Sequence, residues 1–508
     1  MKLIKNLTKK SKWLLGFAAI CLIAASCSDL DENPDFSSSN AFYKSENDAL
    51  TALNGAYDNL GREWFNTMYA RFCFDCILGY STGYEKQPLN YASGALTPGD
   101  GVLASYWDIS YKAINDANNI ITNVPDIEMD ETKKSRIIGE AKFLRGYFYY
   151  HLAVYFDDIP VYTEPTTSFD AAASNEDGKQ RALNQAIADF IDASAALPPS
   201  YSGGDLGRAT KWAALGFLSK TYLETGQFNE ARDAAENVID NSGLTLFDDF
   251  SFNFDVEHEN MGERLFEIQF SYAADPNKNS NFLAHFSPTD WAGPDAENQT
   301  AAAAGWADAW IWGEPEFRMT YDDEDARIPG TFVESYYSRN VNDQVTWDPN
   351  AKSNFVGSGS TERTYRSAYV VKYLETEPSS WDNTERNFPA LRLSDVMLAH
   401  SEAANESGQG DAYLGINTVR ARASLPPLSG LSKQDLKDAI VQERAWEFAF
   451  EGQTFITLKR AGVEYIADYV NTYTNRAADV DGRKDAVLPI PNQEVNANTL
   501  IEQNALWK

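Results

Sequence analysis

The sequence predicts a predominantly α-helical protein in which pairs of helices are interrupted by one long, loop-rich insertion with short strands. Apolar residues recur every three or four positions in most windows of 41–244 and 389–508, which is the spacing of an amphipathic helix. Across 245–388 this periodicity fades, and glycine, asparagine, aspartate and aromatic residues become frequent. We therefore expect a single domain over 41–508, with a helical scaffold at both ends and a variable insertion between them.

The first expected helix begins at a capping box, Ser45-x-x-Asp48. There the serine oxygen accepts from unpaired backbone N–H groups, and the acid suits the positive end of the helix. A second helix is expected over about 106–122. The strongest periodicity in the chain predicts a third over 137–155, which must end before Pro160 because proline cannot continue a helix.

The later helices also come in pairs. The segments 208–224 and 229–239 are joined by a short turn around Gly226 and resemble a tetratricopeptide repeat. In such a pair, small residues allow close helix crossing, and large ones such as Trp212 and Tyr222 fill the space between neighbouring repeats. The other expected elements are helices over 183–197, 391–406, 412–423 and 432–450, and strands over 265–270 and 369–373.

The overall charge excludes one class of partner. The chain of 508 residues carries 43 Lys and Arg against 74 Asp and Glu, a formal net charge of −31. Binding to nucleic acid needs a cationic surface to neutralise phosphates, so a nucleic-acid partner is not expected. A hydrophobic fraction of 43% with 13% aromatics indicates that this acidity belongs to a folded body and not to a disordered tail.

The N-terminus has the features of an export signal. Residues 1–12 contain five lysines and no acid, and the apolar run Trp13–Ala25 is too short to span a bilayer, which takes about 20 residues. The residues before Cys27 resemble a bacterial lipobox, so we expect 1–26 to be removed and Cys27 to be lipidated, with plain secretion as the alternative. Residues 27–40 are polar and are expected to form a tether.

Two other cysteines, Cys73 and Cys76, form a C-x-x-C pair. A zinc site needs four ligands, but no second pair is present and the four histidines are distant in sequence. We expect either buried small apolar residues or a local disulfide. The acidic run Asp322–Asp325 could offer oxygens to calcium but lacks the spaced ligands of a dedicated loop. No metal and no cofactor are therefore expected.

Several ordered motifs of the chain belong together. They are Lys142–Tyr150, Tyr155–Val161, Arg208–Glu224, Leu391–Val396 with Glu402 and Ala403, Val419–Ala423, Glu443–Gly452, Leu458–Arg460, and Leu488–Pro491 with Glu494, Gln503 and Asn504. In this order they resemble the motifs of the SusD-like (RagB/SusD) outer-membrane nutrient-binding lipoproteins. The resemblance extends over nearly the whole mature chain and is weakest in the insertion.

The resemblance implies a fold, a location and a role. Members of this family have tetratricopeptide-like helix pairs and are anchored in the outer membrane, facing the cell exterior. They capture oligosaccharides and deliver them to a SusC-like TonB-dependent transporter, and they are not enzymes. The acidity of the chain disfavours sulfated or carboxylated polymers, so a neutral glycan is the expected ligand.

A cluster of tryptophans in the insertion is the first candidate ligand site. Sugar rings present flat C–H faces and rims of hydroxyls, so a binding site needs exposed aromatic rings flanked by polar side chains. Four of the 12 tryptophans fall within this cluster: Trp291, Trp306, Trp310 and Trp312. The alternative is that Trp306 and Trp310, four positions apart, form the buried stripe of a short helix, and that the other two are also buried.

The second candidate is the loop expected between the first two helices, 75–90. Here Tyr80 and Tyr84 stand among glycines and hydroxyl residues, where the backbone can turn and display the rings. Asp75 and Asn90 could add hydrogen bonds to a ligand. An ordinary surface loop is the alternative.

Other functions have less support in the sequence. There is no G-x-S-x-G, H-E-x-x-H or P-loop motif, so an enzyme is not expected. A peptide-binding member of the same family remains possible, as does a non-transport scaffold or adhesion lipoprotein in which the tryptophan cluster would be buried. Exposure of the cluster separates these alternatives.

Overall fold

The protein was analysed as a computed structural model. It describes residues 42–61, 67–83, 86–166, 172–271, 280, 282–299, 309–374, 386–474, 476 and 480–508. The export signal, Cys27 and the tether therefore lie outside the described residues, and their assignments stay predictions. No helix in the described ranges combines the length and the apolarity needed to cross a membrane.

The N-terminal half of the scaffold is a stack of helices in which chain neighbours pack together. In particular, α7 packs against both α6 and α8, and α9 packs against α8 and α10. This confirms the helical fold class and the expected pairs. The helices are α3 (Glu46–Asp58), α6 (Gly101–Asn123), α7 (Glu131–Phe156), α8 (Gly178–Ala196), α9 (Lys211–Glu224) and α10 (Phe228–Asn241).

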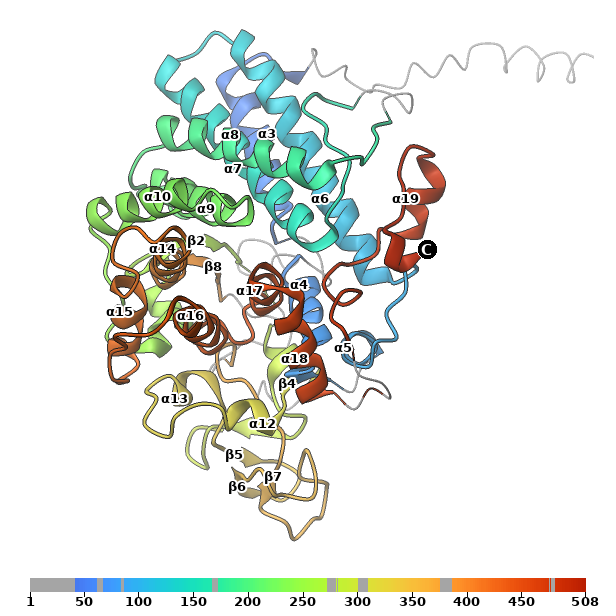
Figure 1. The fold of residues 1–508 in the computed structure, drawn as a ribbon, viewed down its shortest axis with the longest axis vertical. Helices are drawn as coiled ribbons and strands as arrows, with labels where there is room; N and C mark the ends of the chain where they lie inside the picture. The colour runs from blue at the N-terminus through green and yellow to red at the C-terminus, as the bar shows by residue number, and fades with distance from the viewer. Residues whose placement is uncertain are drawn as a thin grey trace, which may run out of the picture.

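The C-terminal helices continue the same stack. Although α14 lies more than 150 residues after α10, the two pack side by side, as the green and orange ribbons of Figure 1 show. Further on, α14 packs against α15 and α16. These elements are α14 (Leu393–Ser407), α15 (Leu414–Arg422), α16 (Lys433–Glu447), α17 (Thr454–Ala461), α18 (Val463–Tyr473) and α19 (Asn492–Ala497).

Local signals fix where these helices begin and end. The predicted capping box is present at α3, where Ser45 accepts from the backbone N–H of Asp48 and the Asp48 carboxylate accepts from that of Ser45. At the C-terminal end of α14, Gly408 adopts a left-handed φ of 67°, a conformation that costs glycine little. Between α9 and α10, Gly226 turns the chain at φ 72°.

Within the described residues, the strands form three small sheets. The strand predicted near 265–270 is β2 (Arg264–Ile268), which pairs antiparallel with β8 (Phe388–Arg392). Four strands of the insertion form a sheet in the order β3-β5-β6-β7, and β1 pairs antiparallel with β4. They are β1 (Ser81–Thr82), β3 (Trp291–Gly293), β4 (Trp312–Gly313), β5 (Ser335–Ser338), β6 (Asp343–Trp347) and β7 (Thr364–Tyr365).

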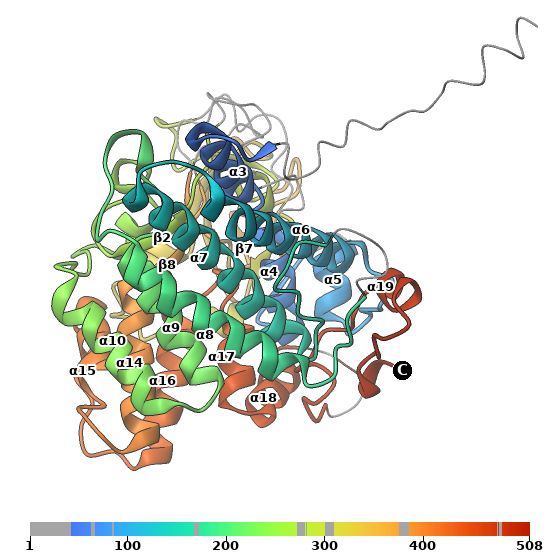
Figure 2. The same cartoon turned by 90° about the horizontal axis from the view of Figure 1, so that it is seen from above.

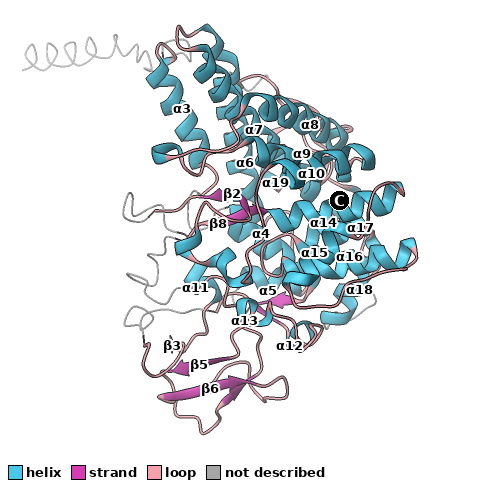
Figure 3. Ribbon diagram, turned by 90° about the vertical axis from the view of Figure 1, so that its left-hand side faces the viewer, coloured by secondary structure: helices cyan, strands magenta, loops and turns pink. Residues whose placement is uncertain are grey.

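The prediction of a strand over 369–373 is wrong. Only Val370 makes a β contact there, an isolated bridge to Phe332. The apolar side chains of this segment are nevertheless buried: Tyr369 packs against Tyr336 of β5, and Tyr373 packs against Phe388 of β8. Burial without strand pairing produces a similar run of apolar residues. Figure 3 shows the resulting division of the molecule, with most helices on one side and the strands and longer loops on the other.

The sequence did not predict a helix at α4 (Thr67–Asp75), which a short 3₁₀ turn extends to Leu78. Every residue of α4 is buried. A helix that is buried on all sides has no polar face and therefore no amphipathic periodicity. Cys73 and Cys76 lie here as buried free thiols, so the buried-residue interpretation holds and the disulfide alternative is wrong. Four shorter helices complete the fold: α5 (Lys86–Ala92), α11 (Phe282–Phe286), α12 (Pro315–Arg318) and α13 (Ile328–Thr331).

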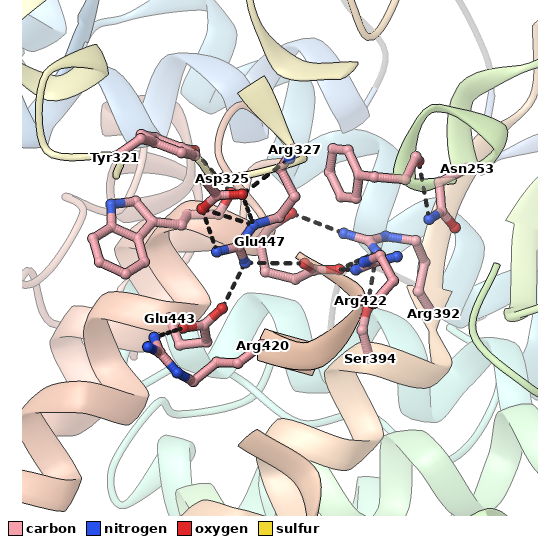
Figure 4. Close-up of polar contacts among 12 residues, drawn as sticks. Asn253, Tyr321, Asp325, Arg327, Arg392, Ser394, Arg420, Arg422, Glu443 and Glu447 are labelled. Carbon is pink, nitrogen blue, oxygen red and sulfur yellow. Dashed lines mark hydrogen bonds and ion pairs between the residues drawn. The ribbon is translucent and has the colours of Figure 1, made fainter. Parts of the chain in front are cut away.

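A buried cluster of charged side chains ties the insertion to the scaffold (Figure 4). From the insertion, Arg327 reaches Glu443 of α16 at 2.7 Å. From the end of β8, Arg392 reaches Glu447 of α16 at 2.6 Å, and Arg422 of α15 reaches the same carboxylate at 2.6 Å. The further members are Glu263, Asp325, Lys372, Arg420 and Glu451. Since these groups pair with one another, their desolvation cost is offset, and the insertion is held in one position.

Candidate functional site

The two candidate segments predicted from the sequence meet in the structure. In the β1–β4 ladder, Ser81 stands opposite Gly313 and Thr82 opposite Trp312. The ladder leaves no room for a side chain at Gly83, because a Cβ atom there would lie 1.6 Å from the carbonyl oxygen of Trp310. The loop after α4 and the last tryptophans of the cluster therefore lie side by side, which their separation in the sequence did not reveal.

Trp310 is the partly exposed aromatic ring at this junction. Its centroid lies 4.9 Å from that of His285 with an interplanar angle of 31°, and 5.8 Å from that of Tyr69 with an angle of 69°. The backbone N–H of Ile311 donates to the carbonyl oxygen of His285 at 2.9 Å and so holds the two segments together. Trp310 is thus a ring backed by two further rings, a geometry that resists tilting when a ligand stacks on it.

His285 is buried, and burial lowers its pKa to about 3. Within the described part of the chain, neither ring nitrogen has a hydrogen-bond partner. The imidazole is therefore neutral at physiological pH and contacts Trp310 as an aromatic ring. No sequence signal pointed to His285 or Tyr69, because their role depends on contacts between distant segments.

Charged groups stand beside β4. Glu314 follows the strand directly, and its backbone N–H donates to the carbonyl oxygen of Tyr80 at 2.8 Å. Its carboxylate lies 3.9 Å from the guanidinium of Arg366, which also reaches Glu316 at 2.6 Å, and all three side chains are partly exposed. Burial raises the pKa of Glu314 to about 7, although Arg366 opposes this. These groups can accept from and donate to ligand hydroxyls.

Trp291 and Trp312 are not available as stacking surfaces, so the expectation that they are exposed is wrong. Their exposed fractions are 4% and 9%, and both belong to the small apolar core under the four-stranded sheet. There Trp291 packs against Tyr336 with ring centroids 5.6 Å apart. A sheet of short strands has few side chains with which to fill its core, so two large indoles do so. Trp306 lies outside the described residues and stays a prediction.

Tyr80 and Asp75 are also interior residues, which corrects the second candidate. Tyr80 packs between Phe317 and Phe450, at centroid distances of 4.6 Å and 5.5 Å. Asp75 accepts from the backbone N–H of Phe455 at 2.9 Å. The glycines around Tyr80 thus allow a buried turn and do not display the ring.

Two residues of the second candidate remain predictions. Tyr84 lies outside the described residues. Asn90 is partly exposed on α5, and its carbonyl oxygen accepts from the backbone N–H of Ala95 at 2.8 Å. Of the possible calcium ligands of 322–325, Asp325 is not available, because it is buried against Arg327 at 2.7 Å.

The two halves of the chain match two family models. Residues 30–223 match a family described as "Starch-binding associating with outer membrane", and residues 271–507 match the SusD family. Together these matches leave only a central segment and the two chain ends unmatched.

Named relatives and solved structures agree with this match. SusD-like protein P2 of Formosa agariphila is 27% identical and covers 97% of this chain and 99% of its own length. A SusD-like protein of Bacteroides ovatus is 26% identical over 92% of this chain and 85% of its own length.

Among solved structures, a laminarin-binding SusD-like protein superposes with a TM-score of 0.75 at 22% identity, covering 91% of this chain and 100% of its own. A SusD-like carbohydrate-binding protein from Bacteroides fragilis gives 0.74 at 20% identity, again over 91% and 100%. At these identities the superpositions establish the fold, and the sequence matches establish the relationship. The chain belongs to the SusD family.

Proposed function

We propose that the protein is a cell-surface glycan-binding lipoprotein that captures oligosaccharides and delivers them to a partner SusC-like TonB-dependent outer-membrane transporter. The observation that carries this proposal is the Trp310 ring, partly exposed and backed by His285 and Tyr69. Such a ring offers a flat surface to the C–H face of a sugar. The Glu314 side chain, which follows β4 on the same segment, and its neighbour Arg366 can serve the hydroxyls of the sugar. The binding described for the family and for its solved members supports the same ligand class.

The ligand is best matched by a neutral glycan. The chain carries a net charge of −31, and two carboxylates, Glu314 and Glu316, stand beside Arg366 at the site. A sulfated or uronate polymer would bring further negative charge next to them, which costs free energy at close range. The protein binds and releases its ligand without chemical change in this scheme, so it needs no cofactor.

Trp310→Ala tests the ligand site. We expect it to reduce retention of the protein in affinity electrophoresis against the polysaccharide that wild type binds best in a neutral panel by at least tenfold. Trp212→Ala, a partly exposed tryptophan on α9, is the matched control and is expected to bind as wild type does. If no glycan retards the wild-type protein, or if Trp310→Ala changes only its stability, the glycan proposal fails. Binding to a peptide panel instead would support the peptide-binding alternative.

The proposed location has a separate test. A lipid on Cys27 would hold the body at the membrane through the polar tether. We therefore expect Cys27→Ala to move the protein from the membrane fraction to the soluble fraction, with its affinity for glycan unchanged. An unchanged membrane fraction would count against lipidation at this residue.

A further inference from the structure

A crevice of about 200 Å³ lies between α6, the extended segment Pro160–Thr166 and the C-terminal end of α19. It shares no lining residue with the Trp310 site. α19 and the chain terminus lie on the α6 side of the molecule, as both Figure 1 and Figure 2 show. Its volume suits a single sugar ring with its hydroxyls, and two questions decide whether it is more than a gap between packed segments: whether its walls are fixed, and what chemistry they present.

The extended wall is fixed by side chains of α6 and α7. Tyr111 donates to the carbonyl oxygen of Pro160 at 2.7 Å. The hydroxyl of Tyr149 donates to the carbonyl oxygen of Tyr162 and accepts from the N–H of the same residue, each at 2.7 Å. The backbone of this segment has no strand partner, so these contacts take the place of a sheet ladder.

Asn118 supports the same wall from the base of the crevice. This buried side chain donates to the carbonyl oxygens of Tyr162 and Glu164, at 3.0 Å and 3.1 Å, and accepts from Arg145 at 2.7 Å. Arg145 in turn forms two parallel hydrogen bonds with the buried carboxylate of Asp189, at 2.8 Å and 2.7 Å. Asn118 is therefore held in one orientation, and the crevice is formed before any ligand arrives.

The lining combines aromatic rings with polar groups. Tyr111 and Tyr162 are both partly exposed and meet edge to face, with centroids 6.0 Å apart and an interplanar angle of 83°. Asn115 accepts from the backbone N–H of Thr166 at 2.8 Å through its side-chain oxygen, which orients its amide nitrogen as a donor. Across the crevice lies the partly exposed carboxylate of Glu494, with the indole of Trp107 also in the lining.

These groups define the ligand class. Two phenol rings at right angles can contact two sides of a sugar ring, while a carboxylate and an amide serve its hydroxyls. None of the described lining residues carries positive charge, and Glu494 lies close to Asp108, so the crevice disfavours an anionic ligand.

We propose that this crevice is a second glycan-binding site, which takes one neutral sugar unit between Tyr111, Tyr162, Asn115 and Glu494. The inference rests on the proposed function for its ligand class and adds a site outside the insertion. Two separate sites would let one polysaccharide chain, or two, be held at once. Retention of a long polymer then exceeds what either site gives alone, because the second contact is intramolecular.

Two variants test the crevice in the full mature chain. Thr166→Trp places an indole over the exposed rim of the crevice and keeps the backbone N–H of residue 166, which donates to the Asn115 side chain. Asn115→Ala removes the amide of that side chain. Thr51→Trp, the same substitution at an exposed position on α3, is the matched control. The probes are trisaccharides of neutral gluco-, manno- and galacto-glycans, titrated by calorimetry. Each crevice variant is also combined with Trp310→Ala.

We expect wild type and Thr51→Trp to bind the best trisaccharide at two sites. Thr166→Trp and Trp310→Ala are each expected to bind at one site, and the double variant at none. Asn115→Ala is expected to weaken the crevice site at least tenfold. If the crevice variants keep wild-type stoichiometry and Trp310→Ala loses all binding, the inference fails and the proposed site stands. If Trp310→Ala keeps both sites, the proposed site fails instead. A wild-type protein that binds no trisaccharide overturns both.

Discussion

The phenol of Tyr80 donates a hydrogen bond of 2.9 Å to the carboxylate of Asp75, and both side chains are buried beneath β1. Burial raises the pKa of Asp75 to about 6, although hydrogen bonds from Phe455 and Tyr80 stabilise the ionised form. The folded protein therefore prefers the protonated acid at a pH where the unfolded chain has already lost that proton.

The first prediction concerns this acid. As pH rises from 3.8 to 6, unfolded Asp75 ionises before folded Asp75 does, so the stability due to this group falls by about 3 kcal/mol and then stays level. We expect Asp75→Asn to remove this loss, which urea unfolding at pH 4 and pH 7 measures. Tyr80→Phe keeps the acid and should retain the loss. An identical pH slope in wild type and Asp75→Asn would contradict the assignment.

The second prediction concerns His285, whose folded pKa of about 3 lies below the ordinary value of 6.5. Below pH 6.5 the unfolded chain takes up a proton that the folded protein excludes, so stability falls as the pH drops towards 3. The loss due to this group is roughly 4–5 kcal/mol. We expect His285→Phe, which keeps an aromatic ring against Trp310, to unfold at lower pH than wild type while binding glycan with similar affinity. Equal acid unfolding midpoints in wild type and His285→Phe would show that the pKa of His285 is not lowered in the folded protein.

The third prediction concerns the buried charge cluster. Burial alone would raise the pKa of Glu447, but Arg422, Arg392 and Arg327 hold it well below its usual range. Its stabilising effect is therefore present above about pH 4.5, and it is lost as the pH falls through the folded pKa. We expect Glu447→Gln to cost about 3–5 kcal/mol at pH 7, since it leaves arginines buried without their partner.

Glu464→Gln, at an exposed position on α18, is the control for this substitution, and it is expected to leave the urea midpoint unchanged. If both variants unfold at the wild-type midpoint, the cluster does not anchor the insertion. The m-value follows the surface area exposed on unfolding. A lower m-value for Glu447→Gln would therefore indicate that the insertion detaches before the scaffold unfolds.

Amphipathic periodicity was enough to predict most of the scaffold. Helices such as α6 and α10 each turn one apolar face to the core, and the sequence shows that face directly. α4 has no such face because it is buried all round, and the apolar run 369–373 is buried against neighbouring strands and helices without forming a strand of its own. In both cases the burial results from tertiary packing, which the spacing of apolar residues along the sequence does not report.

The candidate site was predicted in part, for a related reason. The cluster of tryptophans in the sequence predicts that large rings gather in the insertion. In the structure, Trp291 and Trp312 fill the core of the insertion, while the ring of Trp310 is partly exposed. Which ring has which role depends on the β1–β4 ladder and on His285, and these contacts join positions far apart in the chain. Composition can place a site in a segment, whereas exposure is decided by the segment that packs against it.

The position of the charge cluster has a consequence for how such a protein can change over time. Arg327 and Lys372 hold the insertion at its base, and their partners, Glu443 and Glu451, belong to the scaffold. Substitutions in the loops beyond these anchors leave the anchors intact, so they alter what is bound without costing the fold. Natural selection can thus vary the proposed recognition surface as a separate module. A change of ligand would then require new loop sequences but no change in the helical scaffold.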